Sequence, residues 1–333
     1  MSVKVTSTST VLYGEINLST AEEFLDALTP HRPGVLWSRP NVEGWIFRGQ
    51  RDASWGLGPS AFRVGADGNP AFTQFKDAQL TEPPHALLSE MVDHEESFAL
   101  DFASRVSLAG FEVPGDRPEL RTHQLAIEKH SGCEFPPVEQ RFIYALAQHY
   151  GVPTRLLDWS TSPLTASYFA AEPVARAIHA AKSTPERIAV WALSRPFVEQ
   201  LTDTWNPGPV IITVPTTSNP NLHAQRALFT LVRFRKDTKE CDVGIPPPLD
   251  DLFKDQKKSE VYEARRDVLR GPMLFKITVP ASECPLLMHF LHLHGVDVST
   301  VYPGLHSIAD AMREGKIRSK MQPRRPPPPN ADS

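Results

Sequence analysis

QHYGVPTRLLDWSTSPLTASYFAA, residues 148–171, connects two predicted helices through a short polar segment. The preceding helix, PPVEQRFIYALAQHYG, has prolines at its start and Gly151 at its end, as helices commonly do. The following helix, PLTASYFAAEP, has Pro163 at its first position, with Thr161 or Ser162 placed to cap it. The sequence therefore predicts a helix on each side of this segment.

His149 lies on the apolar face of the first helix. Phe142, Ala145 and Leu146 share this face with it, by i, i+3, i+4 and i+7 spacing. A histidine in this position is either a buried side chain that complements the helix dipole or a general base with a pKa near neutrality. Both interpretations stay open from the sequence.

Arg155 and Asp158 flank an apolar pair, and we expect them to form an internal ion pair that holds the loop. Ser160, Thr161 and Ser162 then place three hydroxyls before a helix, although one suffices as a cap. After a buried acid and at the positive end of a helix, such a run can also present donors to a ligand. Capping and ligand binding both stay open for these residues.

A second informative stretch is GWIFRGQRDASWGLGPSAFR, residues 44–63. Its apolar run reads as a strand that ends in Arg48, Gly49 and Gln50. Arginine at the end of a strand is either a solvated charge or a fork of donors aimed at an anion. Gly49, which has no Cβ, lets the backbone approach a ligand closely.

The composition excludes several classes of protein. The chain has 333 residues, a formal charge of −4 and 41% hydrophobic residues, which suits one large or two modest domains and gives no strong overall field. Three scattered cysteines, Cys133, Cys241 and Cys284, fit a reducing compartment, and no Cys/His spacing predicts a metal site. The polar N-terminus and the lack of a stretch of roughly 18 apolar residues predict a cytoplasmic protein without a membrane span.

Helices gather in the middle of the chain and strands gather after residue 188, a pattern that predicts an α+β fold with a largely antiparallel or split sheet. The predicted strands are VLYGEINL (11–18), GWIFRG (44–49), ERIAVWAL (186–193), GPVIITVP (208–215), RALFTLVRF (226–234) and PMLFKITVP (272–280). The further predicted helices are STAEEFLDALTP (19–30), residues 84–106, 118–130 and 253–270, CPLLMHFLHLHG (284–295) and STVYPGLHSIADAMRE (299–314).

Several blocks of the chain resemble the FRG domain family. Phe47-Arg48-Gly49 resembles the strand motif for which the family is named, and residues 148–171 resemble its most specific block. NLHAQRALFTL (221–231), LFKITVP and VYPGLHSIA resemble its later blocks, so that the resemblance covers roughly residues 40–310. The domain organisation predicted is thus an N-terminal strand and helix at 1–35 and an FRG domain at 36–318, and the basic, proline-rich composition of residues 319–333 predicts a disordered tail. The family occurs in bacterial and phage genomes, including defence-like settings.

A weaker resemblance links the chain to the arginine–serine–glutamate ADP-ribosyltransferases, which use NAD as a substrate. It implies a split antiparallel sheet, with a helical insertion at about 80–147 between the first strand and the Ser-Thr-Ser block. Carried over to this chain, Arg48 would contact the NAD phosphate or ribose, and Ser160, Thr161 and Ser162 would support the nicotinamide pocket. Gly49, Gln50, Arg155 and Trp159 complete the expected NAD-binding set, and Trp159 or Tyr150 could stack on a base.

The chain departs from that pattern because no Glu-x-Glu precedes the late strand. Gln225 aligns best with the missing glutamate, and it can hydrogen-bond a ribose hydroxyl but carries no charge. The role of the acid could then fall to Asp158 or Glu172, with His149 as general base for an acceptor. The predicted catalytic residues are thus Gln225, His149 and Asp158.

Three functions follow from these observations. The first is an ADP-ribosyltransferase or NAD glycohydrolase that modifies a protein or nucleic acid, as a bacterial or phage toxin or anti-phage defence effector with an antitoxin or other neutralising partner. The second is a nucleotide-binding module without catalysis. The third is a nuclease-like hydrolase that uses His149 and Asp158, together with a divalent ion or a second acid.

Overall fold

A computed structural model of the chain describes residues 12–29, 36, 44–63, 88–113, 140–201, 208–214, 219–233, 247–255 and 272–319. Three expectations lie outside these ranges: the helix at 118–130, most of the helix at 253–270, and the proline-rich tail beyond residue 319. Cys133 and Cys241 lie outside them too. Within the described part of the chain, no helix has the length and apolar character needed to cross a bilayer.

Seven strands form one sheet in the order β1-β7-β4-β2-β3-β6-β5. The pair β1–β7 is parallel and the other five pairs are antiparallel, which confirms the α+β class with a mostly antiparallel sheet. The strands are β1 (Tyr13–Asn17), β2 (Trp45–Gln50), β3 (Leu157–Ser160), β4 (Arg187–Ser194), β5 (Gly208–Ile212), β6 (Ala227–Arg233) and β7 (Leu274–Pro280).

The central strands β2 and β3 pair at one position, Phe47 opposite Ser160, whereas β2 and β4 pair along six residues. The pairing between strands is therefore shortest at the middle of the sheet, between β2 and β3. One half contains β1, β7, β4 and β2, and the other contains β3, β6 and β5.

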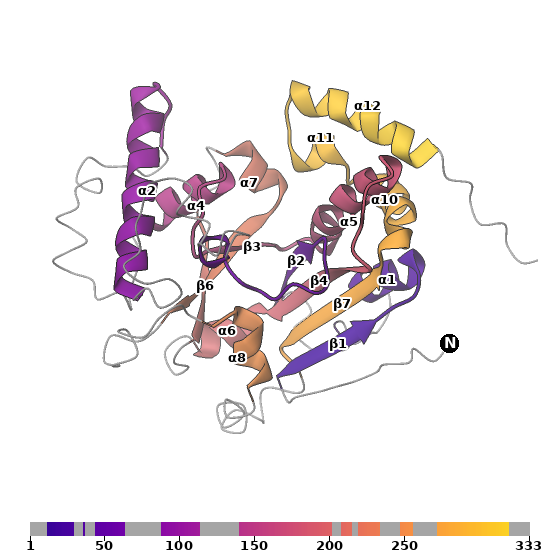
Figure 1. Ribbon diagram of the computed structural model, residues 1–333, viewed down its shortest axis with the longest axis horizontal. Helices are drawn as coiled ribbons and strands as arrows, with labels where there is room; N and C mark the ends of the chain where they lie inside the picture. Colours follow the sequence, from indigo (N-terminus) through magenta and orange to yellow (C-terminus); the bar gives the residue numbers. More distant parts are fainter. Residues whose placement is uncertain are drawn as a thin grey trace, which may run out of the picture.

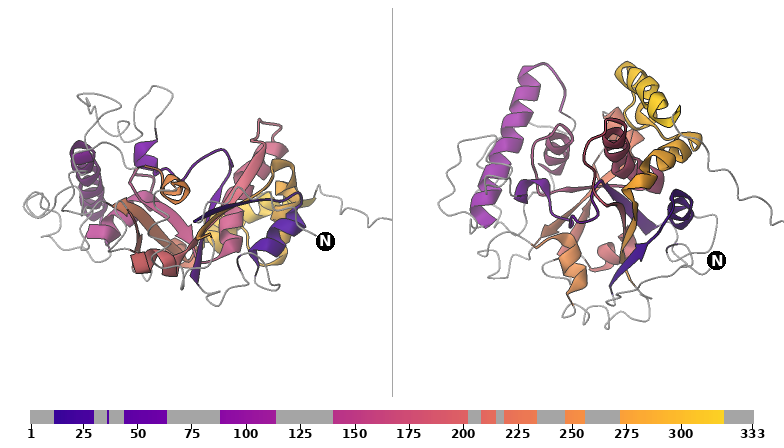
Figure 2. Two further views of the ribbon diagram at one scale, coloured as in Figure 1. Left: turned by 90° about the horizontal axis from the view of Figure 1, so that it is seen from below. Right: turned by 45° about the vertical axis from the view of Figure 1, so that its right-hand side comes forward.

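Helices pack on both halves of the sheet and at both ends of the molecule (Figure 1). They are α1 (Ala21–Leu28), α2 (Leu88–Leu108), α4 (Arg141–His149), α5 (Pro163–His179), α6 (Arg195–Leu201), α7 (Pro220–Ala224), α8 (Leu249–Lys254), α10 (Cys284–Leu293), α11 (Val298–Val301) and α12 (Leu305–Ser319), with short 3-10 turns η2 (Ser60–Phe62) and η8 (Ala281–Glu283). Figure 2 shows that α2 and the C-terminal helices α11 and α12 lie at opposite ends.

Alternation along β2 divides the hydrophobic core between the two faces of the sheet. Trp45 and Phe47 pack in a cluster with α1, α5 and α10, whereas Ile46 packs on the other face with residues of α6 and α8. The helices α2 and α4 form a further cluster with β5 and β6. This arrangement follows from the period of two in a strand that is covered on both faces.

The predicted helix starts of α1 and α5 are confirmed. The side chain of Thr20 accepts a hydrogen bond from the backbone N–H of Glu23, and Ser162 accepts one from that of Thr165. Of the two predicted caps of α5, Ser162 is therefore the cap, and Pro163 follows it at the first helical position. The helix continues through Pro173 to His179, beyond the predicted end.

Three sequence expectations need correction. On the predicted face of α4, Ala145 is fully buried and Phe142 and Leu146 are partly buried against the same cluster, but Ile143, Tyr144 and Ala147 are fully buried as well. The buried surface of α4 is therefore wider than predicted, because α4 packs against both α2 and the β5–β6 side of the sheet. The predicted single helix at 299–314 is two helices, since the chain between α11 and α12 contains a proline and Gly304 at φ +153°. The strand β3 was not predicted at all. The domain boundary at residue 35 stays a prediction. The strand β1, which precedes this boundary, pairs with β7 within the sheet.

Candidate functional site

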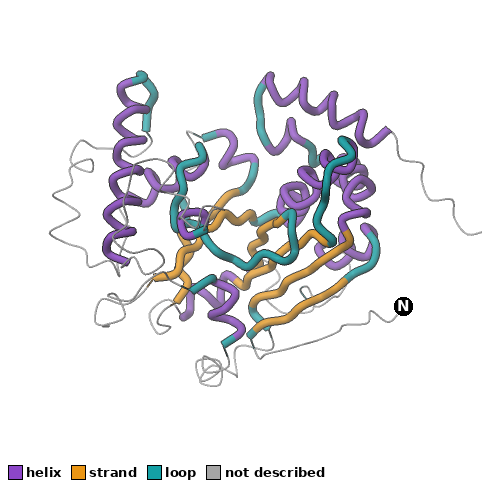
Figure 3. Tube along the Cα trace, in the orientation of Figure 1, coloured by secondary structure: helices purple, strands orange, loops and turns teal. Residues whose placement is uncertain are grey.

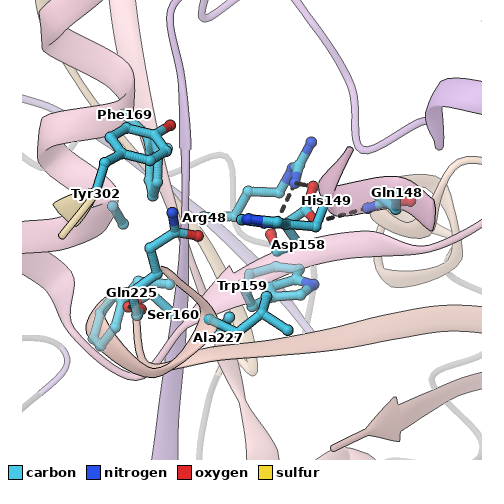
Figure 4. Close-up of a pocket in the computed structure, with 14 residues that line it drawn as sticks. Arg48, Gln148, His149, Asp158, Trp159, Ser160, Phe169, Gln225, Ala227 and Tyr302 are labelled. Atoms are coloured by element: carbon cyan, nitrogen blue, oxygen red, sulfur yellow. Dashed lines mark hydrogen bonds and ion pairs between the residues drawn. The ribbon is translucent and has the colours of Figure 1, made fainter. Parts of the chain in front are cut away.

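A cavity of about 310 Å³ opens where β2 and β3 meet, and it contains most of the predicted site residues (Figure 4). Arg48, Gly49, His149, Asp158, Trp159, Ser160 and Gln225 all line it. The predicted residues Gln50, Arg155, Thr161 and Ser162 are not among its lining residues. Segments more than 170 positions apart in the sequence thus meet in one cavity.

Arg48 reaches this cavity from β2. One of its terminal nitrogens donates a hydrogen bond of 2.8 Å to the backbone oxygen of Asp158 and lies 3.4 Å from the Asp158 carboxylate. The side chain is 13% exposed, and its buried Nε has no hydrogen-bond partner within the described residues. Because a buried N–H without an acceptor is costly, this donor is free to take an acceptor from a ligand.

Asp158 is exposed rather than buried, with 56% of its side chain accessible, and it does not pair with Arg155. Its carboxylate accepts a hydrogen bond of 2.7 Å from the side-chain amide of Gln148 and faces Arg48 (Figure 4). The expected ion pair between Arg155 and Asp158 is therefore wrong, because a different carboxylate, that of Glu95, reaches Arg155.

Arg155 makes a buried structural contact with α2. Its Nε donates to the Glu95 carboxylate at 2.6 Å, its backbone N–H donates to the same carboxylate at 2.7 Å, and both side chains are 3% exposed. This buried pair joins α2 to the start of β3. It explains why Arg155 lies away from the cavity.

The three hydroxyl residues have three different positions. Ser160 lies at the end of β3, where its hydroxyl donates to the backbone oxygen of Gln225 and accepts from the N–H of Ser162. Thr161 is exposed, and its N–H donates to the backbone oxygen of Arg226. Ser162 caps α5. Only Ser160 of the three lines the cavity, and its proton is already donated within the protein.

Gln225 lines the cavity from the turn between α7 and β6. It is 9% exposed, and its amide nitrogen lies 3.4 Å from the backbone oxygen of Val301. The next residue, Arg226, has φ +48°, a left-handed conformation that is unfavourable for a residue with a Cβ. Such backbone strain gathers at functional sites, because the surrounding structure must hold it in place.

His149 lies at the end of α4, on the cavity wall. Its Nε2 is 3.2 Å from the side-chain amide nitrogen of Asn221, which can only donate, so this ring nitrogen accepts. Burial lowers the pKa of His149, and the nearby Asp158 opposes this shift in part. The imidazole is therefore neutral at pH 7, and it can act as a base only when Asn221 releases Nε2.

Gly49 and Gln50 have structural contacts that the sequence did not reveal. A Cβ on Gly49 would lie 1.9 Å from the backbone oxygen of Ala166, so the missing side chain lets α5 pack on β2. Gln50 is 4% exposed, accepts a hydrogen bond from the Trp191 indole and donates one to the backbone oxygen of Gly56. Gly49 still lines the cavity, but close packing of the helix requires the glycine there.

Aromatic residues line the cavity in a way that differs from the expectation. Trp159 is 2% exposed, and its indole N–H donates to the Thr230 hydroxyl, whereas Tyr150 lies outside the lining. Phe169 of α5 and Tyr302, which follows α11, form an edge-to-face pair on the wall. Burial raises the pKa of Tyr302, as do Glu172 and Asp158, so its hydroxyl stays protonated and can donate.

The sequence reasoning missed Gln148, Phe169 and Tyr302. Figure 4 shows the two aromatic residues at one end of the site and Gln148 at the other, with Arg48 and Asp158 between them. All three fall within blocks that carried the family resemblance, which was the available signal. Among the described residues, no group of three or more His, Cys, Asp and Glu side chains could hold a metal ion.

Comparison with known proteins gave one match. Neither the curated proteins nor the solved structures contain a significant match to this chain. A model of the FRG domain family matches residues 43–177, from the start of β2 almost to the end of α5. Arg48, Asp158 and Ser160 lie inside this range, whereas Gln225 and Tyr302 lie outside it. The chain therefore carries an FRG domain at residues 43–177.

Proposed function

We propose that this cavity binds NAD and that the domain cleaves its nicotinamide–ribose bond, transferring ADP-ribose to an acceptor or to water. The observation that supports this proposal best is the meeting of Arg48, Ser160 and Gln225, which the resemblance to ADP-ribosyltransferases singles out, in one cavity. A volume of about 310 Å³ lies at the lower end of the range for ligand sites, roughly 300–1,000 Å³, and suits one nucleotide half of NAD.

Arg48 supplies the contact for a phosphate. A guanidinium presents a planar fork of donors that matches a phosphate group, and the buried Nε of Arg48 lacks an acceptor within the described residues. Asp158 holds the other edge of the same guanidinium. The donor fork is therefore oriented before any ligand arrives.

The remaining lining residues suit the nicotinamide ribose. Phe169 and Tyr302 provide an aromatic wall for a planar ring, and the Gln225 amide can hydrogen-bond a ribose hydroxyl. When the bond between C1 of the ribose and the nicotinamide nitrogen breaks, nicotinamide leaves with the bonding electron pair and the ribose becomes cationic. The Asp158 carboxylate then offers the negative charge that a glutamate would otherwise provide. An acceptor hydroxyl, amine or water forms the new bond to C1 and releases its proton to solvent.

Nucleotide binding without cleavage is the second candidate. Two observations favour it. Gln225 carries no charge, and the Asp158 carboxylate is already paired with the Arg48 guanidinium and hydrogen-bonded by the Gln148 amide. The hydrolase that uses His149 and Asp158 has less support, because Asn221 occupies the accepting nitrogen of His149. The macromolecular acceptor, the neutralising partner and the role as toxin or defence effector stay predictions from the family resemblance.

The test is incubation with NAD, with chromatographic measurement of released nicotinamide. Arg48→Gln should lower kcat/KM by about 10- to 100-fold, the loss expected for one charge-assisted phosphate contact. Arg195→Gln, which removes an exposed arginine paired with Glu199 on α6, is the matched control and should leave the rate unchanged. Gln225→Glu should raise the rate, because it adds the missing charge.

The outcomes separate the two candidates. If NAD stays intact with the wild-type protein and with Gln225→Glu but stabilises both against heat, the binding module is correct. If NAD is neither cleaved nor bound by the folded protein, the proposal is wrong.

A further inference from the structure

The loop that follows β2, residues 51–63, ends beside the cavity. The Ser60 hydroxyl donates to the backbone oxygen of Thr154, and the Thr154 hydroxyl donates to the side chain of Gln148, which lines the cavity. We call this loop the rim of the cavity. The loop between β2 and η2 crosses the middle of the molecule (Figure 3).

The N–H of Leu57 donates to the buried Asp250 carboxylate at 2.6 Å, and the N–H of Ala53 donates to the backbone oxygen of Arg187. A Cβ on Gly56 would lie 3.1 Å from the Asp250 carboxylate. These contacts fix the backbone, so its side chains are presented in defined positions.

Two arginines on this loop gather around one exposed tryptophan. The guanidinium carbon of Arg51 lies 5.0 Å from the centre of the Trp55 ring, and that of Arg63 lies 6.0 Å from it. Arg63 is further held by a hydrogen bond from its Nε to the backbone oxygen of Gly58. The faces of the indole thus hold two cations in place, which would otherwise repel each other.

Arg63 interacts electrostatically with two residues of the cavity, Arg48 and Asp158, and with Arg51. Burial lowers the pKa of Arg63, and the neighbouring guanidiniums of Arg48 and Arg51 lower it further, whereas Asp158 opposes them. The loop at residues 51–63 carries Arg51, Arg63 and Asp52, a net charge of +1, and Arg48 lies near its end with Asp158. An excess of positive charge on a rigid loop favours an anionic ligand.

We propose that Arg51 and Arg63, oriented by Trp55, bind the second phosphate of a pyrophosphate-containing ligand whose first phosphate is bound by Arg48. This inference rests on the proposed function, and it assigns the outer half of the ligand to residues 51–63. The cavity suits only one nucleotide half of a dinucleotide, so the other half must cross the rim. The site therefore selects ligands with two linked phosphates over ligands with one.

The test compares two ligands that the proposed chemistry cannot cleave, ADP-ribose and ribose 5-phosphate, by titration calorimetry. The wild-type protein should bind ADP-ribose at least about 10-fold more tightly, because each lost charge-assisted contact weakens binding by about that factor. Arg51→Gln/Arg63→Gln should reduce the affinity for ADP-ribose to that for ribose 5-phosphate and leave the latter unchanged. Arg51→Gln alone, which breaks no backbone contact, should give part of the effect, and Arg195→Gln should give none.

The controls keep this inference separate from the proposed function. If ribose 5-phosphate and ADP-ribose bind equally well, or if the double variant binds ADP-ribose as the wild type does, the rim site is wrong and the cavity proposal stands. If the folded wild-type protein binds neither ligand, both proposals are wrong.

Discussion

Arg48 joins β2 to β3, where the pairing between strands is shortest, and its guanidinium holds the backbone and the carboxylate of Asp158. This contact fixes the orientation of the guanidinium, whose Nε we propose to contact a ligand. Arg155, only three positions from Asp158 in the sequence, makes no such contact, because Glu95 takes it into the core. Two arginines near the same strand thus have opposite roles, one at a cavity and one in a buried ion pair.

The buried pair gives a prediction about stability. Glu95→Gln removes the Glu95 charge from its buried pair with Arg155, so it should lower the free energy of unfolding by about 3–5 kcal/mol. Asp101→Asn removes a carboxylate from an exposed pair with Arg105 on the same helix, and it should cost less than about 1 kcal/mol. Urea denaturation of both variants measures the difference. Equal losses would show that burial does not distinguish the two pairs.

His149 gives a prediction about pH. Burial lowers its folded-state pKa, so between the unfolded value near 6.5 and the lower folded value the unfolded chain binds the proton first. The contribution of His149 to stability is thus complete above about pH 6.5 and falls as the pH decreases. Unfolding measured from pH 8 to pH 5 should show a shallower pH dependence for His149→Gln than for the wild type. Parallel curves would contradict the buried, neutral histidine.

At the scale of elements, the packing of α5 on β2 positions the cavity. Gly49→Ala places a methyl group against the backbone of Ala166, which cannot move without displacing the helix. We expect it to lower the free energy of unfolding by about 3 kcal/mol, the upper part of the range for overpacking. Gly58→Ala is the matched control, since nothing lies within 4 Å of its Cβ. Equal midpoints in urea for the two variants would be inconsistent with this packing.

The sequence predicted most of the elements because their signals are local. Thr20 and Ser162 cap helices as their neighbours indicate, and six strands appear as apolar runs bounded by turn residues. The sequence did not predict β3, because this strand has only four residues and contains the exposed Asp158. The strand also depends on pairing with β2 and β6. A register with distant strands cannot be read from a local pattern.

The site was predictable to the extent that the family blocks contained it. Arg48, Ser160 and Gln225 line the same cavity, as the resemblance implied, but their roles stay a proposal. The interpretation of Gly49 as a ligand contact missed its packing against α5, since the sequence does not show what lies opposite a glycine. The partner of Arg155 lies 60 positions away in the chain, which is beyond the reach of any spacing rule.

At the scale of the whole molecule, the cavity combines residues from distant segments. Inside the matched range lie β2, β3 and α5, but the strands that flank the central pair, β4 and β6, lie outside it. Tyr302 and Gln225, which complete the cavity wall, lie outside it as well. The described elements after residue 177 are thus required for both the sheet and the cavity.

A fragment of residues 43–177 should therefore not fold alone. It would expose the edges of β2 and β3, which pair with each other at one position, because β4 and β6, the strands that pair with those edges, lie outside the fragment. We expect a non-cooperative thermal transition by circular dichroism, whereas the full chain should unfold cooperatively. A cooperative transition of the fragment would show that the core is more local than the sheet order indicates.

A crystal structure of the protein with bound NAD tests the central claim most directly. The account predicts a phosphate within hydrogen-bonding distance of the Arg48 guanidinium, the nicotinamide ribose beside Gln225, and the adenosine half across the loop at residues 51–63. NAD bound elsewhere on the protein, or an empty cavity at millimolar NAD in crystals that leave the cavity open, would contradict it.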